Sequence, residues 1–367
     1  MSAHRIVIKV GTSTLTGGGG RIDRSVVANL ARQVCELVSD GAQVVLVSSG
    51  AIAAGVERLG LESRPTDMPS LQAAASVGQV ALIEAYSESF ASCGVCTGQV
   101  LLTRNDTGHR ESFLHARDTF ERLLQLGAVP VVNENDTVAV DEIRFGDNDT
   151  LAALVATMVS ADLVVLLSDI DGLYDADPRL SDEATLLQQV DELTDDLVAA
   201  AGGAGTSVGS GGMVTKIDAA KVLMRAGIPM VICDGRKPNV IVDAARGEIV
   251  GTTFDGGEGT LGARKLWIAL GRKPAGLITI DDGACHALRV RKTSLLPAGV
   301  VGVDGRFDCG DAIAIVDTTG AVVARGLAEM TSEQIDHVKG LKSSEIDAVE
   351  PQIAGKPVVH RDHLVVL

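Results

Sequence analysis

Aromatic residues are scarce in this sequence: its 367 residues contain one Trp, two Tyr and six Phe, which amount to 2%. Hydrophobic residues still make up 46% of the chain, so Ala, Val, Leu and Ile must form the interior. Such a composition is typical of buried parallel strands covered by helices. The length exceeds the usual size of a single domain, and we expect a main domain of roughly 250 residues and a smaller one.

Positive charge is also scarce, because 32 Lys and Arg face 48 Asp and Glu and leave a formal net charge of −16. Binding to nucleic acid or to anionic lipid depends on clustered Lys and Arg, so neither partner is expected. No apolar run reaches the ~18 residues that a membrane span needs, and no apolar leader precedes the strand-like segment RIVIKVG. We therefore expect a cytoplasmic protein with no membrane partner, in which a local cationic pocket holds any anionic substrate.

The six cysteines are scattered, and without a secretory leader they do not indicate a disulfide framework. Only CGVC, residues 93–96, has a suggestive spacing. Its functional interpretation is a redox pair or half of a zinc site, but no second CxxC follows. We favour the alternative that two small residues enter a buried strand, and we predict no metal site.

Two alternating patterns fill the first 255 residues. Short apolar runs that end in small or polar residues predict strands buried on both faces at 5–11, 42–50, 97–103, 128–136, 162–169 and 229–235. Apolar residues at helical spacing predict helices over 23–41, 70–92, 110–126, 149–160 and 213–226. This alternation implies right-handed crossovers and an α/β fold, a three-layer αβα sandwich with a mainly parallel sheet.

The sequence changes character towards its end. DGGEGTLGAR, residues 255–264, contains a formal GxGxxG, but it follows no clear strand-to-helix entry and is interpreted as a linker. From Pro274 onward, short strand-like segments alternate with turns and predict a small β-rich domain. We therefore divide the chain into a main domain over 1–255, a linker over 256–273 and a small β-rich domain over 274–367.

Two lysines are the first candidates for chemistry, since ligands of such sheets bind beyond the carboxyl ends of the strands. Lys9 ends an apolar strand that is predicted to be central, where an unpaired buried ammonium would cost several kcal/mol. It can instead project into a cleft beside Gly11, although an exposed edge strand remains the alternative. SVGSGGMVTK, residues 207–216, brings glycines and Lys216 to a helix start that suits phosphate. The Walker A motif occurs nowhere in the chain, but the two lysines together suit a polyphosphate.

Polar groups follow other predicted strands. SSGA (48–51) and NENDT (133–137) offer hydroxyl, amide and carboxylate groups, which suit a zwitterionic small molecule. Each segment alone is more often a turn or a helix cap. FGDNDT places Asp147, Asn148 and Asp149 at one helix start, where a single side chain is enough for capping.

Six segments occur in a fixed order and together resemble the amino-acid kinase family: IKVGTSTLT, VSSGAIAAG, VPVVNENDTV, FGDNDTLAALVA, SDIDGLYDADPR and GSGGMVTKIDAA. The resemblance covers essentially the whole chain, because PAGLITIDDGA, SLLPAGVVGVDGRFDCGD and VVHRDHLVVL are similar to a PUA domain. It implies ATP-dependent phosphorylation, with Mg²⁺, of the γ-carboxylate of L-glutamate, the opening step of proline synthesis. It also implies proline as a feedback inhibitor, a homo-oligomer (dimer or tetramer) and transfer of the acyl phosphate to glutamyl-phosphate reductase.

The resemblance also assigns site residues. It implies that Lys9 and Lys216 contact the phosphates and that Asp149 organises them, so these three are the expected catalytic residues. The residues expected to hold glutamate are Ser49, Gly50, Asn133, Asp136 and Asn148. Those expected to bind ATP are Lys9, Gly11, Ser168, Asp169, Ser210, Gly211, Gly212, Met213, Val214, Thr215 and Lys216. In this interpretation Asn148 faces the substrate, Asp149 holds the cationic side chains, and Asp147 only shapes the loop.

Two other functions remain as alternatives. The first is a related kinase that acts on another carboxylate or on a carbamate. The second is an RNA-binding regulatory protein, because PUA domains elsewhere bind RNA. Residues 274–367 contain nine Lys and Arg against thirteen Asp and Glu, a net charge of −4 that argues against RNA.

Overall fold

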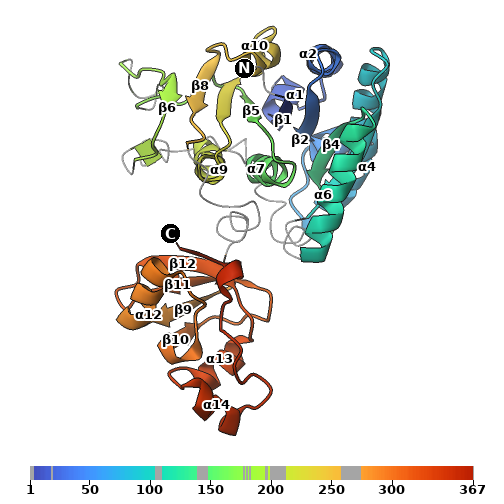
Figure 1. Cartoon of the computed structure of the whole chain (residues 1–367). Helices are drawn as coiled ribbons and strands as arrows, with labels where there is room; N and C mark the ends of the chain where they lie inside the picture. The colour runs from blue at the N-terminus through green and yellow to red at the C-terminus, as the bar shows by residue number, and fades with distance from the viewer. Residues whose placement is uncertain are drawn as a thin grey trace. The chain divides into compact units, whose positions relative to one another are not determined.

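The computed structural model describes residues 4–17, 20–103, 110–138, 148–176, 178, 181, 183–194, 197–198, 212–257 and 274–366. The chain divides into two compact units, Met1–Thr260 and Leu261–Leu367, and each is described by itself (Figure 1). All but the first two residues of the expected linker, 256–273, lie outside the described part. Within the described part, no helix is both long enough and apolar enough to cross a membrane.

An eight-stranded sheet forms the centre of the larger unit, with the strand order β3-β4-β2-β1-β5-β7-β8-β6. Neighbouring strands pair in parallel, except that β7 and β8 are antiparallel. The strands are β1 (Arg5–Val10), β2 (Gln43–Ser48), β3 (Thr97–Leu102), β4 (Val129–Glu134), β5 (Leu163–Ser168), β6 (Gln189–Val190), β7 (Met230–Asp234) and β8 (Gly251–Phe254). The predicted mainly parallel sheet is therefore confirmed, and β1 lies inside it.

Helices cover both faces of this sheet (Figure 1). The helices described here are α1 (Thr12–Thr16), α2 (Arg24–Ser39), α3 (Ala51–Arg58), α4 (Met68–Ala91), α6 (Arg110–Gln125), α7 (Asn148–Met158), α9 (Met213–Ala226) and α10 (Val240–Ala245). Ile6, Ile8 and Val10 of β1 join a core with α2 and α10 on one face. Because side chains alternate along a strand, Lys9 belongs to the opposite face, where α7 packs on β1 and against α9.

The smaller unit contains a five-stranded sheet with the order β10-β9-β11-β12-β13. Its strands are β9 (Gly276–Ile280), β10 (Val300–Asp304), β11 (Ala312–Val316), β12 (Val322–Leu327) and β13 (Leu364–Val366). The short helices α12 (Asp282–His286), α13 (Ser332–Val338) and α14 (Ser343–Val349) accompany it. Ile278, Ile313 and Val323 are fully buried in its own apolar core, which confirms the predicted β-rich domain.

Two expectations about buried segments are wrong. β3 is not buried on both faces: it is one of the two edge strands of the described sheet, and only Leu102 among its six residues is buried. The apolar pattern does not distinguish an edge strand from an inner one, because pairing decides it. Cys93 and Cys96 are exposed free cysteines rather than residues entering a buried strand.

Candidate active site

Five parallel strands end side by side at the carboxyl edge of the larger sheet. The order β4-β2-β1-β5-β7 places Asn133 of β4 and Ser49 after β2 to one side of Lys9, and Ser168 of β5 to the other. Residues that are far apart in the sequence are thereby brought to one edge of the sheet, as the fold predicts. Of the residues expected from the sequence, Ser49 and Asn133 therefore lie on one side of β1, and Ser168 lies on the other.

A buried carboxylate lies between two ammonium groups at the centre of this edge. Asp149 Oδ1 is 2.5 Å from Lys9 Nζ, and Asp149 Oδ2 is 3.2 Å from Lys216 Nζ. Asp149 is 0% exposed, and each lysine is 5% exposed, so water screens these charges only weakly. Two cations against one anion leave the cluster with a net positive charge, which suits an anionic ligand.

The charge of Asp149 follows from its surroundings. Burial alone would raise the pKa of this carboxyl, but the ammonium groups of Lys9 and Lys216 oppose that effect. Hydrogen bonds from Lys9 and Thr215 lower the pKa further, and the result lies well below the ordinary value. Asp149 is therefore ionised at neutral pH and holds both lysines.

The helix start of α9 provides amide donors next to Lys216. Gly212 is the N-cap residue in an extended conformation, and no side-chain hydrogen bond from the described residues caps the helix. The Oγ1 atom of Thr215 lies 2.8 Å from Asp149 Oδ2 and 2.9 Å from the carbonyl oxygen of Gly212. A helix N-terminus of this kind attracts an anion through its N–H groups and its dipole.

Asn148, the residue before Asp149, connects the ends of two strands. Its Nδ2 atom lies 2.8 Å from the carbonyl oxygen of Ser48, 2.9 Å from Ser49 Oγ and 3.0 Å from Asn133 Oδ1. The Oγ atom of Ser48 lies 3.0 Å from the hydroxyl of Tyr86 on α4. One helix start therefore contacts the ends of β2 and β4 through Asn148 and the two lysines through Asp149.

Glycines let α3 begin and pack where it does. Gly50, the N-cap residue of α3, has a φ of 94°, a conformation that favours glycine. Further along, a Cβ atom on Gly55 would lie 1.7 Å from the carbonyl oxygen of Ala74, and one on Gly78 would lie 1.7 Å from that of Ala51. The α3 and α4 backbones are thus in direct contact, and this contact fixes the turn that carries Ser49.

A model of the amino acid kinase family matches residues 4–234, which is more than half of the chain. The chain belongs to the amino acid kinase family. A PUA domain model matches residues 276–349 of this amino acid kinase.

Curated relatives of this amino acid kinase cover nearly its whole length. The glutamate 5-kinase of Caldanaerobacter subterraneus is 47% identical over 363 residues, 99% of this chain and 98% of that protein. The glutamate 5-kinase of Geobacter sulfurreducens is 46% identical over 99% of this chain and 97% of that protein. The glutamate 5-kinase of Methylobacillus flagellatus is 46% identical over all 367 residues and 99% of that protein.

Several expected residues of this amino acid kinase lie outside the two hydrogen-bonded groups. Asp136 follows β4, and burial raises its pKa to about 6 while Arg64 opposes the rise. Gly11 is the N-cap residue of α1, and a Cβ atom there would lie 3.7 Å from Lys9 Nζ. Met213 and Val214 form the first turn of α9, where Val214 is 50% exposed. Asp147, Ser210 and Gly211 fall outside the described residues.

Arg236, just after β7, lies at the same edge of the sheet and is not among the residues expected from the sequence. Ser168 Oγ donates to Asp169 Oδ1 at 3.3 Å. Arg236 Nη2 donates to the carbonyl oxygen of Asp169 at 2.8 Å. Its sequence signal is an arginine directly after the predicted strand at 229–235.

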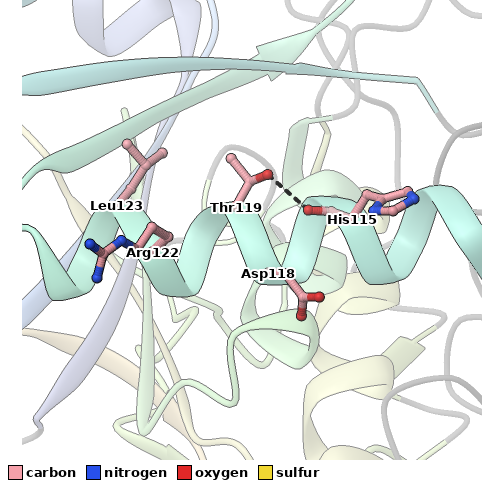
Figure 2. A pocket seen from close by; sticks show the side chains of 5 residues that line it. All are labelled: His115, Asp118, Thr119, Arg122 and Leu123. Carbon is pink, nitrogen blue, oxygen red and sulfur yellow. Dashed lines mark hydrogen bonds between the residues drawn. The ribbon is translucent and has the colours of Figure 1, made fainter.

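A hollow of about 410 Å³ lies elsewhere on the kinase domain, along the exposed side of α6 (Figure 2). Its lining residues are His115, Asp118, Thr119, Arg122 and Leu123. All five belong to one helix, and none is an expected site residue. The carboxyl edge of the sheet, and not this hollow, is the candidate active site.

Proposed function

We propose that this chain transfers the γ-phosphoryl group of ATP to the γ-carboxylate of L-glutamate and forms L-glutamyl 5-phosphate. This reaction is the first step of proline biosynthesis. The observation that carries the proposal is the buried Asp149, which holds Lys9 and Lys216 together between the two groups of polar residues. Full-length relatives that are named glutamate 5-kinase support the same substrate.

The reaction needs no general base, because the attacking oxygen belongs to a carboxylate with an ordinary pKa of ~4.3. The catalytic task is to bring two anions into line and to stabilise the charge on the transferring phosphoryl group. Lys9 and Lys216 contact the phosphates in this proposal, and the N–H groups at the start of α9 provide further donors. Asp149 keeps the two ammonium groups close together without neutralising both.

Glutamate binds on the β2 and β4 side in this proposal. Asn148 and Ser49 offer an amide and a hydroxyl, and Gly50 lets the backbone approach the ligand. Asn133 holds Asn148 in place through its Oδ1 atom. Asp136, half-buried after β4, is the carboxylate that pairs with the α-ammonium group of the substrate.

ATP binds on the β5 and β7 side, and Mg²⁺ accompanies it. Ser168, Asp169 and the segment 210–216 receive the nucleotide in this proposal. Among the described residues, no group of three or more His, Cys, Asp or Glu could hold a metal ion. Mg²⁺ that is bound to a nucleotide is held mainly by phosphates and water, so this donor set fits a Mg·ATP complex. The metal would neutralise phosphate charge, which the two lysines also do.

The proposal also includes an inhibitor, an oligomeric state and a partner enzyme. Proline carries the same α-ammonium and α-carboxylate groups as glutamate, so it would compete for the same residues as a feedback inhibitor. We also propose a cytoplasmic homo-oligomer, a dimer or a tetramer. The acyl phosphate is labile, which favours its direct transfer to glutamyl-phosphate reductase.

A hydroxylamine trap tests the proposal. The protein, ATP, Mg²⁺ and hydroxylamine are incubated with glutamate, with aspartate or with N-acetylglutamate, and hydroxamate and ADP are measured. We expect both products with glutamate only. Equal or faster turnover with another carboxylate would show that this other carboxylate is the substrate. If none of the three carboxylates led to ATP consumption, the proposal would be overturned.

A further inference from the structure

Arg236, just after β7, joins the ends of two neighbouring strands. Its Nε and Nη2 atoms lie 2.8 Å from the two oxygens of Asp234, which is a two-pronged ion pair. The same Nη2 atom donates to the carbonyl oxygen of Asp169, just beyond the end of β5, at 2.8 Å. The side chain therefore spans from β7 to the turn that follows β5.

The backbone beneath this side chain is fixed. Ser168 pairs with Asp234 in the register of β5 and β7, and Gly235 N donates to the carbonyl oxygen of Ser168 at 2.9 Å. A Cβ atom on Gly235 would lie 2.7 Å from Thr14 Cγ2, so this turn packs directly on α1. Because Arg236 follows Gly235, its side chain starts from a defined position at the strand edge.

The charge of Arg236 is already matched by carboxylates. The hydrogen bond with Asp234 raises the pKa of the arginine, and the charges of Asp169 and Asp171 act in the same direction. The side chain of Asp234 is 14% exposed, whereas that of Arg236 is 61% exposed. A guanidinium fork on a mostly buried carboxylate has a defined direction, which a lysine at this position could not reproduce.

We propose that Arg236 is a positioning residue of the nucleotide site, which holds the Ser168–Asp169 turn in the orientation that receives ATP. The inference rests on the proposed function, in which these two residues face the nucleotide. Arg236 acts through the backbone of Asp169 and not as a positive charge on the phosphates. Its loss therefore weakens ATP binding and leaves glutamate binding, on the other side of β1, unchanged.

The test compares Arg236→Gln, Arg236→Lys and Asp234→Asn with the wild type. The matched control is Arg246→Gln, because Arg246 also pairs with two carboxylates but joins α10 to the end of α2. We expect the KM for ATP to rise about tenfold in Arg236→Gln and in Arg236→Lys, which corresponds to about 1.4 kcal/mol. The KM for ATP should rise in Asp234→Asn as well. The kcat and the KM for glutamate of these variants should stay near wild type, and so should the kinetic constants of Arg246→Gln.

Three results would overturn the inference. A wild-type KM for ATP in Arg236→Lys would show that only the charge matters. A wild-type value in Asp234→Asn would show that the fork is not needed. A parallel rise of both KM values, or a lower Tm that explains the loss, would show a general structural role.

Calorimetric binding of ATP separates this inference from the proposed function. Binding needs no turnover, so the same three variants can be compared without glutamate. Weaker ATP binding in all three supports the role of Arg236 even if the wild type makes no hydroxamate. Unchanged binding in all three overturns the inference even if glutamate is the substrate.

Discussion

The substitution Asp136→Asn should make the protein more stable and a poorer enzyme. Asp136 is half-buried after β4, and burial raises its pKa to about 6 although Arg64 opposes this. Burial therefore disfavours the charged carboxyl, which the proposed function needs for the ammonium group of glutamate. Removing the charge relieves that cost and removes the ion pair with the substrate.

The stability change can be worked out from the pKa. A rise from 3.8 to about 6 corresponds to about 3 kcal/mol in favour of the protonated form. Because the pKa in the folded state lies above that in the unfolded state, this stabilisation is complete below pH 3.8 and is lost as the pH rises through about 6. At pH 8, Asp136→Asn should raise the free energy of unfolding by up to about 3 kcal/mol, and at pH 4 by little.

The catalytic change has the opposite sign. A hydrogen bond to a charged group contributes about 1.5–3 kcal/mol, so the KM for glutamate should rise about tenfold to a hundredfold in Asp136→Asn. In the wild type, this KM should also rise as the pH falls through about 6, because protonation removes the same charge. The KM of the variant should not depend on pH in this range, and the KM for ATP should not change.

Urea unfolding at pH 4 and pH 8 measures the first effect, and the KM for glutamate between pH 5 and pH 8 measures the second. Asp118→Asn is the control, because the side chain of Asp118 is 66% exposed on α6. A variant that is less stable than the wild type at pH 8 would refute the argument from burial. A wild-type KM for glutamate that is constant over this range would refute the role in binding the ammonium group.

Two further substitutions test the centre of the site, and a third tests the helix packing beside it. Asp149→Asn should lower kcat at least about a hundredfold with an unchanged circular dichroism spectrum, and a wild-type kcat would contradict its role. Asn148→Asp should raise the KM for glutamate at least about tenfold, measured at constant ATP, because a carboxylate would face the oxygens of Ser48 and Asn133 without a donor. Gly78→Ala should lower stability by about 1–3 kcal/mol in thermal unfolding, because the new methyl group would overlap the α3 backbone. Val80→Ala, on the exposed side of the same helix, should leave the stability in thermal unfolding unchanged.

Lys9 shows what the sequence alone could predict. Burying an unpaired charge at the end of an apolar strand is costly. The sequence alone therefore predicted that the Lys9 side chain projects into a cleft at the strand end. The structure adds what that argument does not contain: Lys9 is 5% exposed, and Asp149 on another element compensates its charge. The partner was expected only from the family resemblance, because spacing along the chain does not show which elements meet.

Arg236 and the glycines of α3 and α4 show what could not be predicted. An exposed arginine after a turn is common, and its role depends on β5 and β7 being neighbours in the sheet. Gly55 and Gly78 weaken helix propensity, and the reason for their presence appears only where the two backbones meet. In both cases the decisive information is the pairing of elements that are distant along the chain.

The start of α7 explains why a helix carries two polar residues where one would cap it. Consecutive residues on a helix point about 100° apart, so neighbouring side chains reach different parts of the sheet edge. Asn148 reaches the ends of β2 and β4, and Asp149 reaches Lys9 and Lys216. In the proposed reaction, the distance between the attacking carboxylate and the phosphoryl group is therefore set by one turn of a buried helix. A rigid helix suits this task, since in-line transfer tolerates little variation in that distance.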